Sequence, residues 1–252
     1  MSNQHVDSNR RFLNLHVTGS AQLRRFREVP VRRGNFLAVE LHGADPAQPI
    51  DCIVRGSAAL SAMEHIGPLV EKGHDVRVGF RAGDLFVHQF ESHNQQEDRT
   101  VTRHLMKARL FDLSWVCVDG EPRSFRGAGD MEPNEDPVRV HALAYLNGFS
   151  ERADRYYADL TALHGEVTGG QKPERVPMAW RADRWTRLCN MLRSGLEARS
   201  TVVVGFEGIA PRLSDDSGPR VCVDLDRVVY AKMGADVVYH RESGSDSQAQ
   251  AA

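Results

Sequence analysis

The sequence has few cysteines and no long apolar run, and each shortage excludes a class of protein. Its four cysteines (Cys52, Cys117, Cys189 and Cys222) stand far apart with no CxxC spacing. This excludes a zinc ribbon and gives no disulfide framework. No apolar run approaches the roughly 20 residues that cross a bilayer, and the polar start MSNQHVDSNRRF lacks the apolar core of an export signal. We therefore predict a cytoplasmic protein with reduced cysteines.

Signatures of catalysis are missing as well. The 11 histidines show no HxxxH or HExxH spacing, and RGAGD at 126–130 lacks the Gly-Lys-Ser/Thr ending of a P-loop. The pairs His42/Glu40 and His164/Glu166 have no evident third ligand. We predict no catalytic residue, no metal site and no cofactor, and thus a protein that is not an enzyme.

Charge is unevenly distributed, although the net charge is only −2. Residues 24–33 carry five arginines (Arg24, Arg25, Arg27, Arg32 and Arg33) against one acid, Glu28. Residues 99–111 carry four cations and no acid. The basic residues thus gather in two segments of the first half.

Alternating apolar residues predict three strands, a helix and two more strands in the first half. We expect the strands at 12–19, 35–43, 50–56, around 76–80 and at 105–120, with loops through the basic segment and at 91–100. The helix, 57–73, should end or break near Gly67-Pro68. Gly79 inside the fourth strand predicts a bend. This order is that of an OB-fold, a five-stranded barrel that needs bends to close.

The second half repeats the plan. VGF at 78–80 returns as VGF at 204–206, and strands are expected at 141–148, 156–165 and 175–182 before a helix at 183–198. The alternative is that two unrelated α+β domains share a glycine by chance. We predict an all-β protein with one helix per unit, as two tandem OB-fold-like barrels. The expected boundaries are an OB domain at 12–120, a linker at 121–137, a second, degenerate OB-like domain at 138–240, and disordered tails at 1–11 and 241–252.

Three phrases of the first half carry a resemblance to known proteins: REVPV with its following glycine and phenylalanine, VGFRAGDL, and KARL. Together they closely resemble a family of bacterial integrative-conjugative-element replication proteins, over residues from about 12 to 122. Those proteins look like divergent single-stranded-DNA-binding (SSB) proteins with an OB-fold. The resemblance implies that the predicted barrels are SSB-like. The resemblance implies an accessory role on single-stranded DNA in replication or transfer of a mobile element. This chain departs from SSB proteins by having Trp115 as its only tryptophan in this half and by lacking their acidic tip.

OB-folds bind single strands with cations along the backbone and aromatic rings against the bases. Alternation puts Val76, Val78 and Phe80 inside with Arg77 and Arg81 outside, and Met106, Ala108 and Leu110 inside with Arg103, Lys107 and Arg109 outside. Phe36 should lie exposed, and Phe86 and Phe90 follow the fourth strand, where SSB proteins also place an aromatic. The predicted site on one barrel face therefore comprises Arg24, Arg25, Arg27, Arg32, Arg33, Phe36, Arg77, Arg81, Phe86, Arg103, Lys107 and Arg109. Exposed arginines can instead merely keep a sheet edge soluble, and such aromatics are more often core residues.

The expected ligand is single-stranded DNA, with RNA as an open alternative and no membrane. At the positions matching Arg77 and Arg81 the second half has Val203 and Glu207. We therefore expect that half to serve self-association or to bind another replication or transfer protein. Val203, Trp180 and Tyr230 would form an apolar patch there, or be buried. The competing function is a protein-interaction subunit of the same machinery that binds no DNA.

Overall fold

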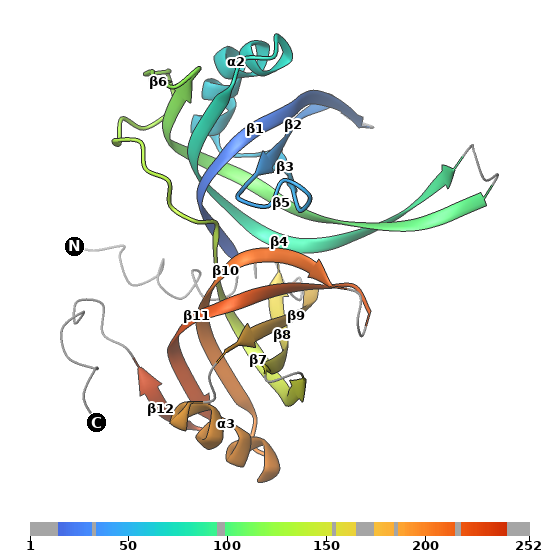
Figure 1. Cartoon of the computed structure of the whole chain (residues 1–252), viewed down its shortest axis with the longest axis vertical. Coiled ribbons are helices and arrows are strands. Elements are labelled where there is room, and N and C mark those ends of the chain that lie inside the picture. The colour runs from blue at the N-terminus through green and yellow to red at the C-terminus, as the bar shows by residue number, and fades with distance from the viewer. Residues whose placement is uncertain are drawn as a thin grey trace.

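The structure is a computed structural model that describes residues 15–31, 34–94, 99–152, 155–164, 174–183, 186–214 and 218–240. The described residues form a mostly β protein with two helices (Figure 1). None of these helices is long and apolar enough to span a membrane. The two tails predicted at 1–11 and 241–252 lie outside the described residues.

Five strands of the first half pair in a closed circuit. The elements are β1 (His16–Val31), β2 (Gly34–His42), β3 (Ile50–Val54), α2 (Ser57–Glu71), β4 (Val76–Asn94), β5 (Arg99–Val118) and the short β6 (Glu121–Pro122). β1 pairs with both β2 and β4, β2 with β3, β3 in parallel with β5, and β5 with β4. The order of three strands, a helix and two strands is the predicted one.

The second half repeats this connectivity. Its elements are β7 (Arg139–Arg152), β8 (Arg155–His164), β9 (Glu174–Ala182), α3 (Arg187–Glu197), β10 (Val202–Ser214), β11 (Arg220–Met233) and β12 (Asp236–His240). β7 pairs with β8 and β10, β8 with β9, β9 in parallel with β11, and β11 with β10. β12 pairs with the end of β11, as the shorter β6 pairs with the end of β5.

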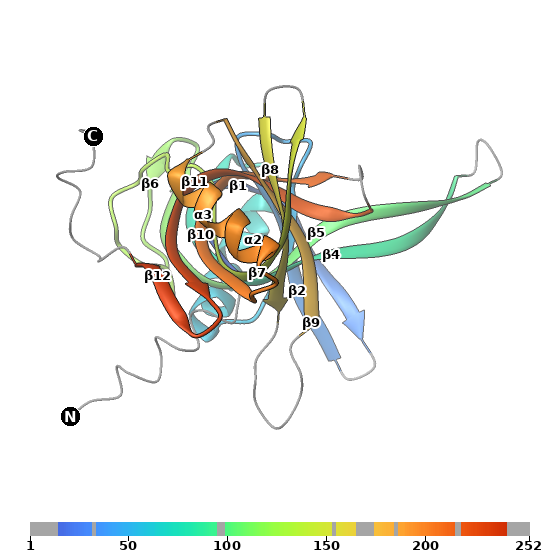
Figure 2. The same cartoon turned by 90° about the horizontal axis from the view of Figure 1, so that it is seen from below.

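Two of the predicted loops are strand instead. β1 continues through the basic segment to Val31, with a bulge between Arg24 and Arg27 and a positive φ of 52° at Arg25. β4 and β5 extend through most of 91–100 into an arm that projects from the body (Figure 2). An arm standing away from the core is stabilised by cross-strand pairs rather than by burial. Residues 91–94, ESHN, therefore show no apolar alternation that would predict a strand.

The helix prediction was wrong at one end, because α2 continues through Gly67 and Pro68 to Glu71. Proline removes one backbone donor, whose helical acceptor would be the carbonyl of Glu64. Both Pro68 and Glu64 are exposed, so water can satisfy that carbonyl. Gly67 lies on the buried side, where an added Cβ would stand 2.5 Å from the ring of Phe26.

Gly79 sits at a bend of β4, as predicted. The register shifts between Gly79 and Phe80, and a Cβ at Gly79 would lie 2.3 Å from Nε1 of Trp115. The register of the second half shifts at the matching place, between Gly205 and Phe206. The repeated phrase therefore encodes a repeated bulge. Trp115 is buried beside it and belongs to the core.

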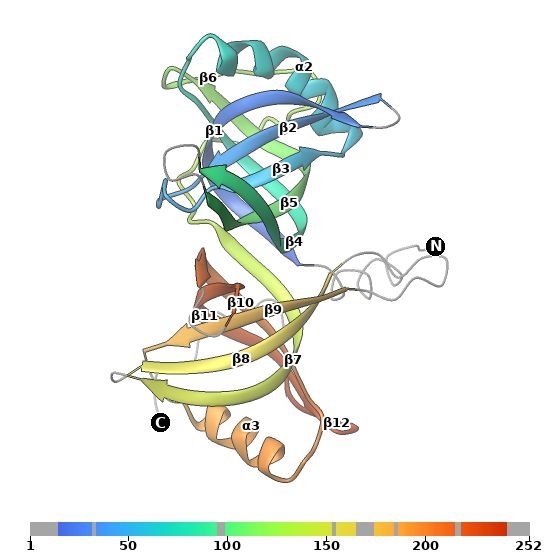
Figure 3. The same cartoon turned by 90° about the vertical axis from the view of Figure 1, so that its right-hand side faces the viewer.

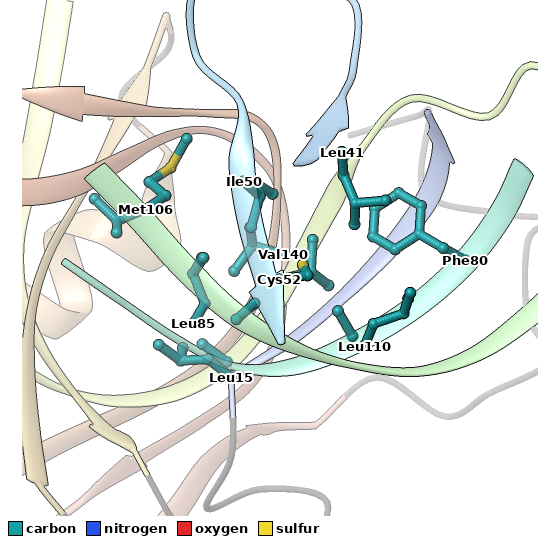
Figure 4. Packing of buried hydrophobic residues seen from close by; sticks show 14 of the residues in the cluster. Leu15, Leu41, Ile50, Cys52, Phe80, Leu85, Met106, Leu110 and Val140 are labelled. Atoms are coloured by element: carbon teal, nitrogen blue, oxygen red, sulfur yellow. The ribbon is translucent and has the colours of Figure 1, made fainter. Parts of the chain in front are cut away.

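The core lies inside the strand circuits and joins at the centre of the molecule. Leu15, Leu41, Phe80, Leu85 and Val140 belong to one cluster of buried side chains (Figure 4). Val140 comes from β7, which pairs with the start of β1 through Val17. The two halves therefore share a hydrogen-bonded sheet and part of their core.

The predicted linker does not cross open space. Residues 123–137, here called the strap, lie along the first half, where the amide of Gly129 donates to the carbonyl of Leu113 at 2.8 Å. The amide of Ser20 donates to the carbonyl of Asp136 at 2.9 Å. Phe125 packs against the core. Backbone hydrogen bonds and one apolar anchor thus fix a segment whose composition predicts a free tether.

The Gly79 bulge predicts a difference in stability. Gly79→Ala should lower the free energy of unfolding by about 1–3 kcal/mol, because its Cβ would overlap Trp115 and Ser114. Gly148→Ala is the control, since no atom lies within 4 Å of its added Cβ, and should change stability by less than about 0.5 kcal/mol. Urea unfolding measures both, and equal stabilities of the two variants would contradict the proposed close packing at Gly79.

Candidate nucleic-acid interface

A cluster around Asp51 occupies the outward side of β2, β3 and β5. Asp51 lies opposite Glu40 on β2 and opposite Lys107 on β5. Nη2 of Arg27 is 2.5 Å from Oδ1 of Asp51, and Nζ of Lys107 is 3.8 Å from Oδ2. The structure thus brings together two predicted cations, and a carboxylate with a 14% exposed side chain stands between them.

Glu40 continues this cluster toward β1. Nη1 of Arg25 lies 2.9 Å from Oε1 of Glu40, and Nε2 of His42 lies 3.2 Å from Oε2. Burial works to raise the pKa of Glu40, but the hydrogen bonds from His42 and Arg25 outweigh it and hold the pKa below its ordinary value. Glu40 is therefore charged at neutral pH, and Arg25 is already paired.

Arg109 extends outward beside a buried carboxylate. Nη1 of Arg109 is 3.2 Å from Oδ2 of Asp84, whose side chain is only 3% exposed. Asp84 has a φ of 54° at a further bulge in β4, between Gly83 and Phe86. In the structure it lies inside β4 and anchors Arg109.

Aromatic side chains alternate along the β4 arm beyond that bulge. Phe86, His88 and Phe90, here called the aromatic ladder, lie opposite Lys107, Leu105 and Arg103 of β5. The rings of Phe86 and His88 meet edge to face at 6.4 Å, and those of His88 and Phe90 stack at 6.0 Å with 15° between planes. All three are half-buried. Directly opposite residues share a sheet face, so rings and cations line the same side of the arm.

His88 was missed by sequence reasoning, although the pattern Phe-x-His-x-Phe marks it. Burial lowers the pKa of His88 below its ordinary value, and the charge of Lys107 lowers it further. The imidazole is therefore neutral at neutral pH. A neutral ring between two phenylalanines extends the flat surface that they offer.

Phe36 lies at the other end of the same sheet face. It is half-buried, and the guanidinium carbon of Arg55 lies 4.0 Å from the centre of its ring. That distance is typical of a cation–π contact. Arg55 was not predicted, because it follows β3 outside both basic segments. With it, one face of Phe36 is covered.

The predicted cations do not all gather at this face. Arg77 pairs with Glu135 of the strap at 2.6 Å, and Arg81 forms an ion pair with Asp112. Both lie on the part of β4 that pairs with the beginning of β1. Arg24 donates from Nε to Gln22, and Arg103 is exposed on the arm with no ion pair to any described residue. Arg32 and Arg33 lie outside the described residues.

The second half reverses one of these pairs. Where the first half has Arg81 with Asp112, the second has Glu207 on β10 with Arg227 on β11, 2.7 Å apart. Trp180 is buried and packs edge-on against Phe206 with ring centres 5.2 Å apart. Trp180 therefore contributes to the core of the second half rather than to a surface patch.

Metal chemistry gains no support from the part of the chain that the structure describes. Within it, no group of three or more His, Cys, Asp or Glu side chains is placed to hold a metal ion. The cysteines at 52, 117, 189 and 222 are free thiols.

A family model described as a protein of unknown function, DUF3577, matches residues 6–125. The match spans nearly the same residues as the resemblance noted in the sequence, and its description assigns no function and no mobile element. No curated protein matches the sequence.

Three solved structures match the chain in part, each with a TM-score below 0.5. The wild-type single-stranded DNA binding protein from Thermus aquaticus is 16% identical, with a TM-score of 0.45, covering 93% of this chain and 98% of that one. A deletion mutant of the same protein is 14% identical, with a TM-score of 0.43, covering 92% of this chain and 97% of that one. A replication protein A heterotrimer bound to ssDNA is 11% identical, with a TM-score of 0.21, covering 89% of this chain and 49% of that one. At such scores the function of this chain must be argued from its own residues.

Proposed function

We propose that the first half is an OB-type barrel that binds single-stranded DNA along the outward side of β2, β3 and the β4–β5 arm. The observation that carries this proposal is the aromatic ladder beside Arg103 and Lys107 on a projecting arm. The closed circuit of five strands, with α2 between β3 and β4 and bulges in β4, supports the OB-type barrel. The second half, with the same circuit, is proposed as a second barrel of this type.

The chemistry of binding follows from the two kinds of side chain. Bases stack on the rings of the ladder, which is favourable for every base and so needs no sequence. Phosphates contact Arg103 at the arm, then Lys107 and Arg27 near Asp51. Lys107 and Arg27 must leave the carboxylate of Asp51 to contact a phosphate. Asp51 and Asp84 thus hold cations in place before DNA arrives.

The resemblance of the phrases at 12–122 adds a setting to this proposal: replication or transfer of an integrative conjugative element. In that setting the protein would coat or deliver the displaced strand. RNA presents the same phosphates and equally flat bases, so we expect RNA to compete for this surface.

A protein-interaction role without DNA is the second candidate. The observation that favours it is the pairing of Arg25, Arg27, Arg77, Arg81 and Arg109 with carboxylates, which leaves little uncompensated positive charge. Binding of labelled oligo-dT at low salt separates the two functions. No binding at about 20 mM salt, where phosphate contacts are strongest, would favour protein interaction.

Removing a ring from the aromatic ladder should weaken the stacking of bases. Phe90→Leu should weaken oligo-dT binding by about 1–3 kcal/mol per base lost, because leucine fills a similar volume but offers no flat face. The slope of affinity against salt should stay unchanged, since no charge is removed. Fluorescence anisotropy at several salt concentrations measures both. Phe26→Leu, at a ring packed under α2, is the control and should leave DNA affinity as it was.

Removing the cations of the arm should change the salt dependence of DNA affinity. The double variant Arg103→Gln/Lys107→Gln should bind more weakly and lower the salt slope by about 1.4, since each of the two phosphate contacts on a single strand contributes about 0.7. Lys72→Gln/Arg126→Gln, two exposed cations away from this face, is the control. An unchanged slope in the first variant would exclude these contacts.

Asp51→Asn is the reciprocal variant of the same experiment. It removes the carboxylate that holds Arg27 and Lys107, so both become available to phosphate. Affinity should rise and the slope should become steeper. Weaker binding would mean that Asp51 acts by positioning the cations rather than by competing with DNA.

His88 predicts a pH dependence of binding. Its pKa in the free protein lies below the usual value of about 6.5 because of burial and Lys107. A bound phosphate favours the protonated ring, so affinity should rise as pH falls through that lowered pKa. We expect a gain of about threefold or more between pH 8 and pH 5.5 at constant salt. His88→Gln should lack this part of the gain, and an identical pH profile in both proteins would refute the role of His88.

A further inference from the structure

Three arginines gather on the outward side of the second half, at Arg181 on β9, Arg212 on β10 and Arg220 on β11. Alternation fixes their side: Trp180 and Val221 are buried, so Arg181 and Arg220 point away from the core. Tyr157 on β8 lies directly opposite Arg181 and is half-buried on the same side. Sequence reasoning missed this group because each arginine stands alone in the sequence.

Two carboxylates are shared among these three cations. Nη2 of Arg181 is 2.7 Å from Oδ2 of Asp224, and Nη2 of Arg212 is 2.9 Å from Oδ1 of the same group. Arg220 reaches Asp159 at 3.4 Å, and its Nε is buried with no hydrogen-bond partner in the described structure. The group therefore keeps one net positive charge and unused donors.

The position of this group continues the face of the first half. The amide of Leu213, next to Arg212, donates to Oε1 of Gln48 at 3.0 Å, and Gln48 lies in the turn between β2 and β3. β4 also contacts β8 and β11. Figure 3 looks onto β2 and β3 above and onto β8 and β9 below, so both sheets face the same side of the molecule.

We infer that a single strand bound by the first half continues past the β2–β3 turn onto the second half. There its phosphates contact Arg212, Arg220 and Arg181, and a base stacks on Tyr157. This inference rests on the proposed DNA binding of the first half. It replaces the expectation that the second half serves only protein contact with a continuous DNA path.

In the full-length protein, the length of the oligonucleotide distinguishes binding to one half from binding to both halves. An oligo-dT of about 8 nucleotides fits one OB-fold, whereas one of about 30 reaches both. A longer strand offers more registers and so binds more tightly in any case, but its salt slope counts phosphate contacts. We expect a steeper slope for the long strand by about 1 to 2, from two or three added contacts.

The variants test which residues make the added contacts. Arg181→Gln/Arg212→Gln should weaken binding of the long strand about tenfold and lower its slope by about 1.4, and should leave the short strand unaffected. Arg187→Gln/Arg193→Gln, two exposed arginines on α3, is the matched control and should change neither. Thermal unfolding checks that all variants are folded.

A crosslink in the unaltered protein keeps the test independent of folding. With 5-iodouracil placed near either end of the long strand, one end should crosslink to Tyr157. Equal slopes for both strands, or no adduct at Tyr157, would overturn the inference and leave the proposed function standing. Absence of binding to either strand would instead refute the proposed function itself.

Discussion

The bend of β4 is the constraint on which the rest of the first half depends. A closed circuit of five strands needs strongly bent strands, and β4 bends at Gly79 while it pairs with β1 on one side and with β5 on the other. A further bulge lies between Gly83 and Phe86, where the arm begins. The aromatic ladder begins directly after it. The surface proposed to bind bases therefore begins on the same strand whose bend helps to close the core, one bulge further along.

The repeat preserves this geometry while its charges change. Arg81 with Asp112 and Glu207 with Arg227 occupy matching places with opposite polarity. The two halves keep an ion pair at this place but exchange the strands that carry its acid and its base. This argues that the pair stabilises the sheet and that Arg81 is a structural residue. The cations of the second half are found instead on β9, β10 and β11. The charges at matching positions therefore do not describe all the cations of the second half.

The alternation of apolar residues predicted which strand residues are buried, but it did not predict the exposed strand extensions or the pairs formed across strands. Val76, Val78 and Phe80 are buried as expected, because a sheet with one apolar face must alternate. The extensions of β1 and of the arm were missed, since exposed strands need no such pattern. The partners of the cations were missed for another reason. Asp51 meets Lys107 across the parallel β3–β5 pair, and no local spacing of the sequence reveals that contact.

In the proposed binding mode, cations that are already paired change the energetics of DNA binding. When a phosphate takes Lys107 and Arg27 from Asp51, the freed carboxylate must attract a cation from solution. Part of the counterion release that drives binding is then lost, so affinity depends less on salt than the number of cations suggests. Stacking on Phe86, His88 and Phe90 supplies a larger share of the free energy in return. A protein with a net charge of −2 can in this way hold a single strand by its bases, with few unpaired charges to retain other polyanions.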